Sequence, residues 1–119
     1  MRYSELLVWQ KAMDLVTEIY KITATFPNEE RFGLSSQARR AAVSVPSNIA
    51  EGHGRKATGA YINHLSIAHG SLMELETQTQ IAVRLDFIAE AQASVLLKQM
   101  DEIAKMLSGL KKSLSAKVE

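Results

Sequence analysis

The chain has 119 residues, the length of one folded domain, and 46% of them are hydrophobic, which excludes an intrinsically disordered segment. It contains no cysteine, which excludes a disulfide framework and thiolate chemistry, and its net charge of +1 makes no global case for or against nucleic-acid binding. Because no apolar run approaches the roughly 20 residues of a membrane-spanning helix and no signal peptide is evident, we expect one cytoplasmic domain over residues 1–119, without membrane contact.

Four helices are predicted from apolar side chains that recur every three or four residues, with prolines and glycines at the joints. They cover residues 5–26, 34–53, 58–85 and 89–116. The first, for which Ser4 is a candidate N-cap, carries two apolar stripes that together span roughly half of its circumference. That is wider than the face that a helix usually buries in one small bundle.

The second predicted helix has a polar stripe about 100° around the helix from its apolar one. The polar stripe consists of Gln37, Arg40, Ser44, Asn48, Glu51 and Arg55. Pro46 lies inside the helical pattern, where it removes one backbone donor and should kink the helix. Gly52 and Gly54 are the candidate terminators of this helix.

The third predicted helix, with Thr58 as its candidate N-cap, also carries a second stripe beside its main apolar one. This second stripe consists of Ile67, Ser71, Glu74, Gln78, Ile81 and Leu85. Gly70 lies in mid-helix, and its small size makes a low spot that another backbone could approach closely. The fourth helix, in contrast, has a single apolar face and needs only one neighbouring surface to cover it.

Short connections between these helices favour an all-α, antiparallel, up-down four-helix bundle. The first three helices have more packable surface than one bundle covers, and exposed surface of that kind usually marks an interface. We therefore expect a homo-oligomer. Its candidate interface residues are Gln37, Arg40, Ser44, Asn48, Glu51, Ile67, Ser71, Glu74 and Gln78, and its candidate structural residues are Pro46, Gly52, Gly54 and Gly70.

Catalytic and metal-binding patterns are missing from the sequence. His53, His64 and His69 form no i, i+4 pair and no Glu-x-x-His motif, so we expect no metal site and no cofactor. Ser44 and Ser47, near Pro46, are better explained as groups that satisfy exposed backbone than as nucleophiles. The glycine-rich stretch after the second helix lacks the residue order of a phosphate-binding loop. We expect no enzymatic activity.

Nucleic-acid binding is one remaining hypothesis. Arg39, Arg40, Arg55 and Lys56 lie on the second helix and its exit, and a symmetric ring would repeat them in every subunit. The alternative is that the arginines pair with Glu51, Glu74 or Glu76 across helices or subunits.

Several stretches carry a resemblance to a known family. They are residues 6–12, 26–30, 54–55 and 68–76 and, above all, the block LSSQARRAAVSVPSNIAEG at 34–52. The chain resembles the bacterial four-helix bundle family that includes proteins encoded in intervening sequences of large-subunit ribosomal RNA genes. Asp86 is a departure, because relatives often place glycine there before an aromatic residue; aspartate tolerates a left-handed turn better than most residues.

The resemblance implies an up-down bundle that assembles as a ring-shaped homopentamer without enzymatic activity. Relatives include the accessory protein of diversity-generating retroelements, which works with a reverse transcriptase and RNA. The family's motif positions fall here on Gln37, Arg40, Ser44, Pro46, Asn48, Glu51, Gly52 and Arg55. Two functions follow as expectations: a ring that binds RNA or another nucleic acid through a repeated basic patch, or a scaffold that docks a protein partner without touching nucleic acid.

Overall fold

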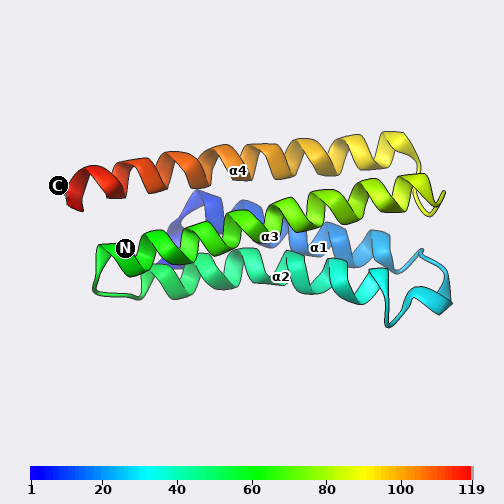
Figure 1. The fold of residues 1–119 in the computed structure, drawn as a ribbon, viewed down its shortest axis with the longest axis horizontal. Helices are drawn as coiled ribbons and strands as arrows, with labels where there is room; N and C mark the ends of the chain where they lie inside the picture. The colour runs from blue at the N-terminus through cyan, green and yellow to red at the C-terminus, as the bar shows by residue number, and fades with distance from the viewer. Residues whose placement is uncertain (119) are drawn as a thin grey trace.

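In the computed structural model, which describes residues 1–118, four helices form a rod with extents of 48 × 23 × 20 Å (Figure 1). The elements in chain order are η1 (Tyr3–Glu5), α1 (Leu7–Thr23), η2 (Asn28–Glu30), α2 (Leu34–His53), α3 (Thr58–Arg84) and α4 (Glu90–Val118). No strand occurs in this part of the chain, so the predicted all-α fold with four helices is confirmed. None of the helices described is long and apolar enough to cross a bilayer.

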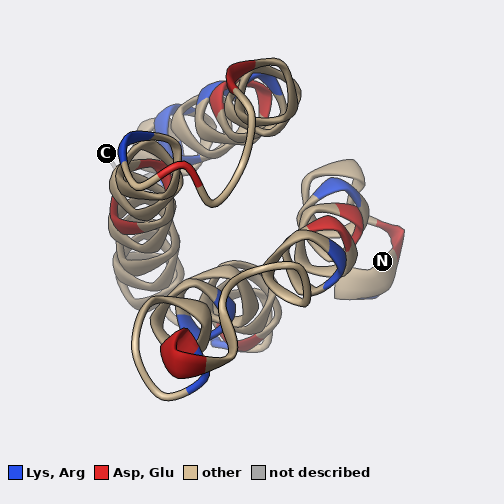
Figure 2. Ribbon diagram, turned by 90° about the vertical axis from the view of Figure 1, so that its right-hand side faces the viewer, with Lys and Arg blue, Asp and Glu red and all other residues tan. Residues whose placement is uncertain are grey.

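The helices run alternately up and down (Figure 1), and Figure 2 shows them arranged around a common axis. The larger of two clusters of buried side chains lies between them. The most extensive helix–helix contact joins α2 to α3, and the least extensive of the neighbouring pairs joins α1 to α4. Side chains that are at most 1% exposed come from all four helices and include Leu15, Ile49, Leu72 and Met100. The predicted apolar stripes therefore meet along the bundle axis, as their spacing requires.

Small residues allow the close contact between α2 and α3. A Cβ atom on Gly52 would lie 2.8 Å from the Cβ atom of His64 and 2.9 Å from Cδ1 of Tyr61, so only glycine fits there. Its predicted role as a terminator is wrong, because α2 runs through the buried Pro46 and through Gly52 to His53. Gly54 does follow the helix, but with a φ of −78° that any residue adopts. Gly52 is therefore required for packing.

The predicted serine and threonine caps are also wrong. Ser4 lies inside the 3-10 turn η1, and α1 begins after Leu6, which has no side-chain oxygen. Thr58 is already the first residue of α3. At the start of α2, the carboxylate of Glu30 accepts a hydrogen bond from the Leu34 amide at 3.1 Å. A side chain from the preceding turn thus satisfies a free helix amide.

The turn between α3 and α4 confirms that Asp86 adopts a left-handed backbone conformation. This residue has a φ of 60°, in the left-handed region. The amide of Phe87 donates to the carbonyl of Ala82 at 2.9 Å, and the amide of Asp86 donates to the carbonyl of Val83 at 3.0 Å. This pair of bonds is a Schellman motif, which closes a helix at a left-handed residue.

Candidate functional site

The nine candidate interface residues lie along one surface, the α2–α3 seam. At its centre the Ser71 hydroxyl donates to Oγ of Ser44 at 2.8 Å. The Asn48 amide nitrogen donates to the same Oγ at 3.0 Å and to the Ser44 carbonyl at 2.9 Å, and Oδ1 of Asn48 lies 3.0 Å from Nδ1 of His64. The hydroxyl of Ser44 is thus bonded by side chains of both helices. The antiparallel register carries the other seam residues alongside this network.

The ends of the α2–α3 seam differ in burial. Gln78 is only 6% exposed, and its amide nitrogen donates to Glu74 at 3.2 Å, while its Oε1 has no partner in the described chain. Glu51 lies 3.8 Å from Nδ1 of His64 and is exposed. Arg40 is exposed, and it makes no ion pair within residues 1–118. No arginine forms an ion pair within residues 1–118, so the predicted arginine–glutamate pairs between helices are absent there.

The four candidate nucleic-acid-binding residues fall into two separate pairs. Arg39 and Arg40 lie in the first half of α2, whereas Arg55 and Lys56 lie in the turn that follows it. At 1.5 Å per residue, about 20 Å of helix separates Arg40 from the end of α2 at His53, and Arg55 lies beyond that end. The structure therefore does not bring the four together as one patch, and Figure 2 shows basic and acidic residues interspersed on the helices.

Arg39 is held within its own subunit. Its Nε donates to Oγ1 of Thr23 at 2.8 Å, and its Nη2 donates to the Tyr20 carbonyl at 3.2 Å. The guanidinium also lies 4.6 Å from the centre of the Tyr20 ring, within the range of a cation–π interaction. Arg39 thus ties α2 to the end of α1, and fewer of its donors remain for a ligand.

Beside Arg39 is an open hollow of about 540 Å³, which we call the arginine hollow. It is lined by Tyr20, Arg31, Phe32, Ser36, Arg39, Arg40, Val43 and Ser44. Sequence reasoning missed the contributions of Tyr20, Arg31 and Phe32, which come from α1 and from the turn before α2. The sequence did contain one signal for them, an arginine followed directly by a phenylalanine, Arg31 and Phe32, just before the second predicted helix.

A second groove follows the same two helices toward the opposite end of the rod. This α1–α2 groove has a volume of about 300 Å³ and is almost entirely apolar. It is lined by Tyr3, Trp9, Met13, Val16, Val43, Pro46, Ser47 and Ala50. Such a groove has the composition of a packing surface, since it offers few groups for polar recognition.

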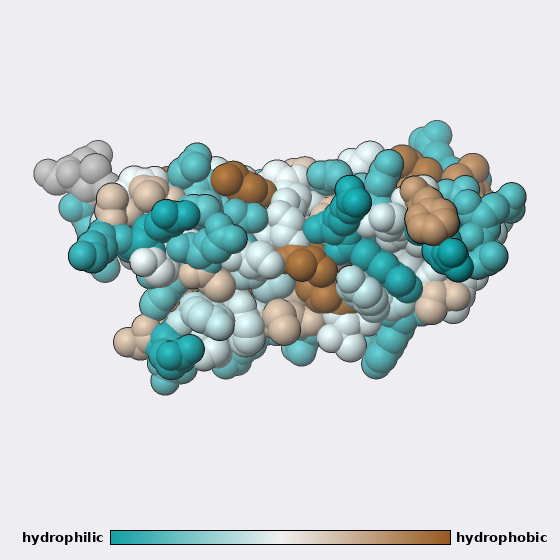
Figure 3. Space-filling model, turned by 90° about the horizontal axis from the view of Figure 1, so that it is seen from below, coloured by the Kyte–Doolittle hydropathy of each residue, from teal (hydrophilic) through white to brown (hydrophobic). Residues whose placement is uncertain are grey.

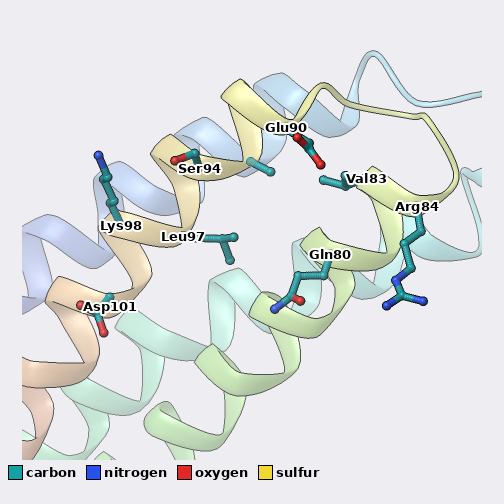
Figure 4. Close-up of a pocket in the computed structure, with 9 residues that line it drawn as sticks. Gln80, Val83, Arg84, Glu90, Ser94, Leu97, Lys98 and Asp101 are labelled. Carbon is teal, nitrogen blue, oxygen red and sulfur yellow. The ribbon is translucent and has the colours of Figure 1, made fainter.

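The α3–α4 hollow, also of about 540 Å³, lies between those two helices near their connecting turn (Figure 4). Val83 and Leu97 point toward one another across it, and Lys98 points away. Its rim carries acidic and basic residues from both helices, among them Arg84 and Asp101. This arrangement has an apolar floor and no set of converging catalytic groups.

Titratable groups do not converge in the part of the chain that the structure describes. No three His, Asp or Glu side chains there could hold a metal ion. Burial raises the pKa of Tyr61, whose ring packs edge-on against His53 with 5.8 Å between ring centres. Tyr61 thus packs α3 against the end of α2.

Large apolar side chains remain exposed mainly on α1 and α3. They are Leu7, Met13, Tyr20, Val43, Ile67, Met73 and Ile81, and Val95 is the one on α4 among the described residues. Figure 3 shows hydrophobic side chains, in brown, reaching the surface at several separate places on one face. The distribution matches the expectation of extra apolar surface for α1 and α3, whereas α2 exposes no more large apolar side chains than α4 does.

Comparison with known proteins places this fold in a family. A search of curated proteins found no match. A solved structure, of a protein of unknown function from the S23 ribosomal protein family of Bacteroides thetaiotaomicron VPI-5482, superposes with a TM-score of 0.81 at 26% sequence identity, covering 89% of this chain and 99% of that one. The family model for the 23S rRNA-intervening sequence protein matches residues 4–109. The chain therefore belongs to the 23S rRNA-intervening sequence protein family.

Proposed function

We propose that this chain is a non-enzymatic assembly protein that forms a homopentameric ring through α1, α2 and α3. The observation that carries the proposal is the uneven distribution of exposed large apolar side chains: among the described residues, α1 and α3 carry three each, whereas α2 and α4 carry one each. Leaving such side chains in water is unfavourable by about 25 cal/mol for each Å² of apolar surface, so a second copy that covers them stabilises the assembly.

Two different faces support a cyclic arrangement. One is the apolar α1–α2 groove, and the other is the α2–α3 seam with Ile67 and Ile81 beside it. A ring forms when one face of a subunit packs on a different face of the next and the rotation closes. Glu74 on the seam is exposed and has no ion-pair partner within the described chain, so it is free to pair with a neighbour.

The experiment is a mass measurement by light scattering or native mass spectrometry. We expect about 66 kDa, five times the 13.2 kDa of the chain. Ile67→Glu places a charge on the seam and should reduce the mass to that of one subunit. Val95→Glu is the matched control, because Val95 is 60% exposed against 46% for Ile67 yet lies on α4. A wild-type mass of 13 kDa at micromolar concentration contradicts the proposal.

For the ring's ligand we propose RNA, bound by the repeated arginines. The support is that Arg40, Arg55 and Lys56 are all exposed, and none makes an ion pair within residues 1–118. Binding that rests on phosphate contacts weakens steeply as salt increases. We expect filter retention of RNA at 50 mM salt that is lost at 300 mM, and that is reduced by Arg55→Glu with Lys56→Glu, two exposed positions outside the seam. Arg39 is left unchanged because it holds α1 to α2.

The alternative is a scaffold that docks a protein partner without contacting nucleic acid. The α3–α4 hollow favours it, because this apolar-floored site lies away from the α1–α2 groove and the α2–α3 seam and would stay open in the ring. A partner bound there should survive nuclease treatment and moderate salt during purification. Leu97→Glu, which charges the floor of the hollow, should release it while leaving the mass of the ring unchanged.

A further inference from the structure

The arginine hollow combines positive charge with exposed aromatic rings. Arg31, Arg39 and Arg40 line it, and no acidic residue within 1–118 does. The nearest carboxylate in sequence, on Glu30, is engaged with the Leu34 amide at the start of α2. The α3–α4 hollow, of the same volume, carries both acids and bases. The arginine hollow is therefore suited to an anion, whereas the other is not.

The aromatic component is Phe32, which is 85% exposed in the turn before α2. Its ring contacts the Arg31 guanidinium, which lies 4.8 Å from the ring centre. Phe32 is absent from both apolar core clusters of the described chain. Burial does not explain a phenylalanine so exposed, but a flat ligand stacked on it would cover the ring.

The floor of the hollow is held in place by Arg39. Its bonds to Thr23 and to the Tyr20 carbonyl leave its guanidinium plane against the Tyr20 ring at 4.6 Å. Arg31 and Arg40 make no ion pair within residues 1–118. The hollow thus has a rigid floor and two arginines available at its rim.

We propose that the arginine hollow binds an unpaired nucleotide of single-stranded nucleic acid, with its base stacked on Phe32 and the flanking phosphates bound by Arg31 and Arg40. This inference rests on the proposed RNA function and specifies its site and the form of the ligand. Sites for single strands combine a positive groove with aromatic rings on which bases stack. Duplex RNA hides its base faces in the helical stack, so it could use the arginines but not Phe32.

An acidic peptide is the competing ligand class. Carboxylates would bind the arginines as phosphates do, but they offer no planar ring for Phe32. A neighbouring subunit is the other competitor, because Ser44 and Arg40 belong both to the hollow and to the α2–α3 seam. The test must therefore separate stacking from charge, and ligand binding from assembly.

The experiment measures fluorescence anisotropy of labelled U10 RNA with the full chain at 50 mM salt. We expect Phe32→Ala to weaken U10 binding about tenfold and Phe32→Trp to preserve it, since stacking needs only an aromatic face. Val95→Ala, at an exposed apolar position on α4, should change nothing. Removing one phosphate contact with Arg31→Ala should reduce the slope of log K against log salt by about 0.7.

Three further probes assign the ligand. Labelled dT10 should respond to Phe32→Ala as U10 does if the base stack is the determinant, and a weaker response would assign the site to RNA. A ten-base-pair RNA duplex should bind equally to wild type and Phe32→Ala. Polyglutamate should compete with U10 only through its negative charge. Its own affinity should therefore be the same for wild type and Phe32→Ala.

Each alternative result overturns the inference in a distinct way. If U10 binds Phe32→Ala as well as wild type, the stacking site is wrong while RNA binding by the ring stands. If wild type of pentameric mass binds no U10, both the inference and the RNA function fail while the assembly stands. If Phe32→Ala lowers the mass, or polyglutamate binds and U10 does not, the hollow is a subunit contact or a peptide site.

Discussion

The Ser71 hydroxyl donates to Oγ of Ser44 at 2.8 Å and so joins α3 to α2 at the centre of the α2–α3 seam. Both side chains are half-buried, so water competes only partly for this bond. We predict that Ser71→Ala lowers the free energy of unfolding by about 1 kcal/mol, the usual net contribution of one hydrogen bond. In urea unfolding at fixed protein concentration, a double-mutant cycle with Ser44→Ala should show a coupling of about 0.5–1 kcal/mol. Strictly additive effects would contradict a direct bond.

Gly52→Ala should be strongly destabilising. The added Cβ would lie 2.8 Å from the His64 Cβ atom and 2.9 Å from the Tyr61 ring, so α2 and α3 would have to move apart. Overpacking of this kind costs about 1–3 kcal/mol, which exceeds the 0.5–1 kcal/mol that alanine contributes over glycine in a helix. Urea unfolding measures the difference. An unchanged midpoint would show that the two helices have room to separate.

Gly70→Ala is the matched control for Gly52→Ala, and we expect it to stabilise the protein. Nothing lies within 4 Å of a Cβ added there, so the close approach predicted at this position does not occur within the subunit. Alanine should then raise the free energy of unfolding by about 0.5–1 kcal/mol. Thermal unfolding at low protein concentration checks this. A lower midpoint, together with a lower mass, would place the backbone of a second copy against Gly70.

Asp86→Gly should also stabilise the protein, by about 0.5–1 kcal/mol. Asp86 has a φ of 60°, which costs free energy for any residue with a Cβ atom and little for glycine. Asp86→Ala keeps the Cβ and loses the local polar side chain, so it should be no more stable than wild type. Urea unfolding of the two variants separates the backbone effect from a general loss of the aspartate side chain.

Sequence periodicity predicted best the helices whose buried side chains belong mostly to their own apolar stripe. Helix α2 matches residues 34–53 at both ends. The end of α1 was placed three residues too late, because Phe26 continues the apolar spacing. In the structure Phe26 instead packs on Phe87, with 5.4 Å between ring centres, in a second cluster beneath the turns. The spacing of apolar residues along the sequence does not distinguish a side chain buried on the face of a helix from one buried beneath a turn.

The candidate site also has one part that the sequence pattern predicted and one part that it did not. The α2–α3 seam was predictable because its residues recur at helical spacing on two segments. The arginine hollow was not, because Tyr20, Phe32 and Arg40 belong to three different parts of the chain and meet only when α1 and α2 pack together. Arg39 illustrates the consequence. Its charge suggested a ligand contact, whereas its position beside Thr23 makes it a link between helices.

Tyr61 predicts how stability depends on alkaline pH. Burial raises the pKa of Tyr61 in the folded state, so the folded protein holds this phenolic proton more tightly than the unfolded chain does. The Tyr61 contribution to stability is therefore fully present below the unfolded tyrosine pKa of about 10 and is lost as pH rises through the folded value.

The free energy of unfolding should fall more steeply above pH 10 in wild type than in Tyr61→Phe, while the difference between the two stays constant from pH 7 to 9. All other residues are the same in the two proteins, so their contributions cancel in the comparison. Subtracting the 295 nm absorbance titration of Tyr61→Phe from that of wild type isolates this one phenol, and a midpoint at or below 10 would contradict the prediction.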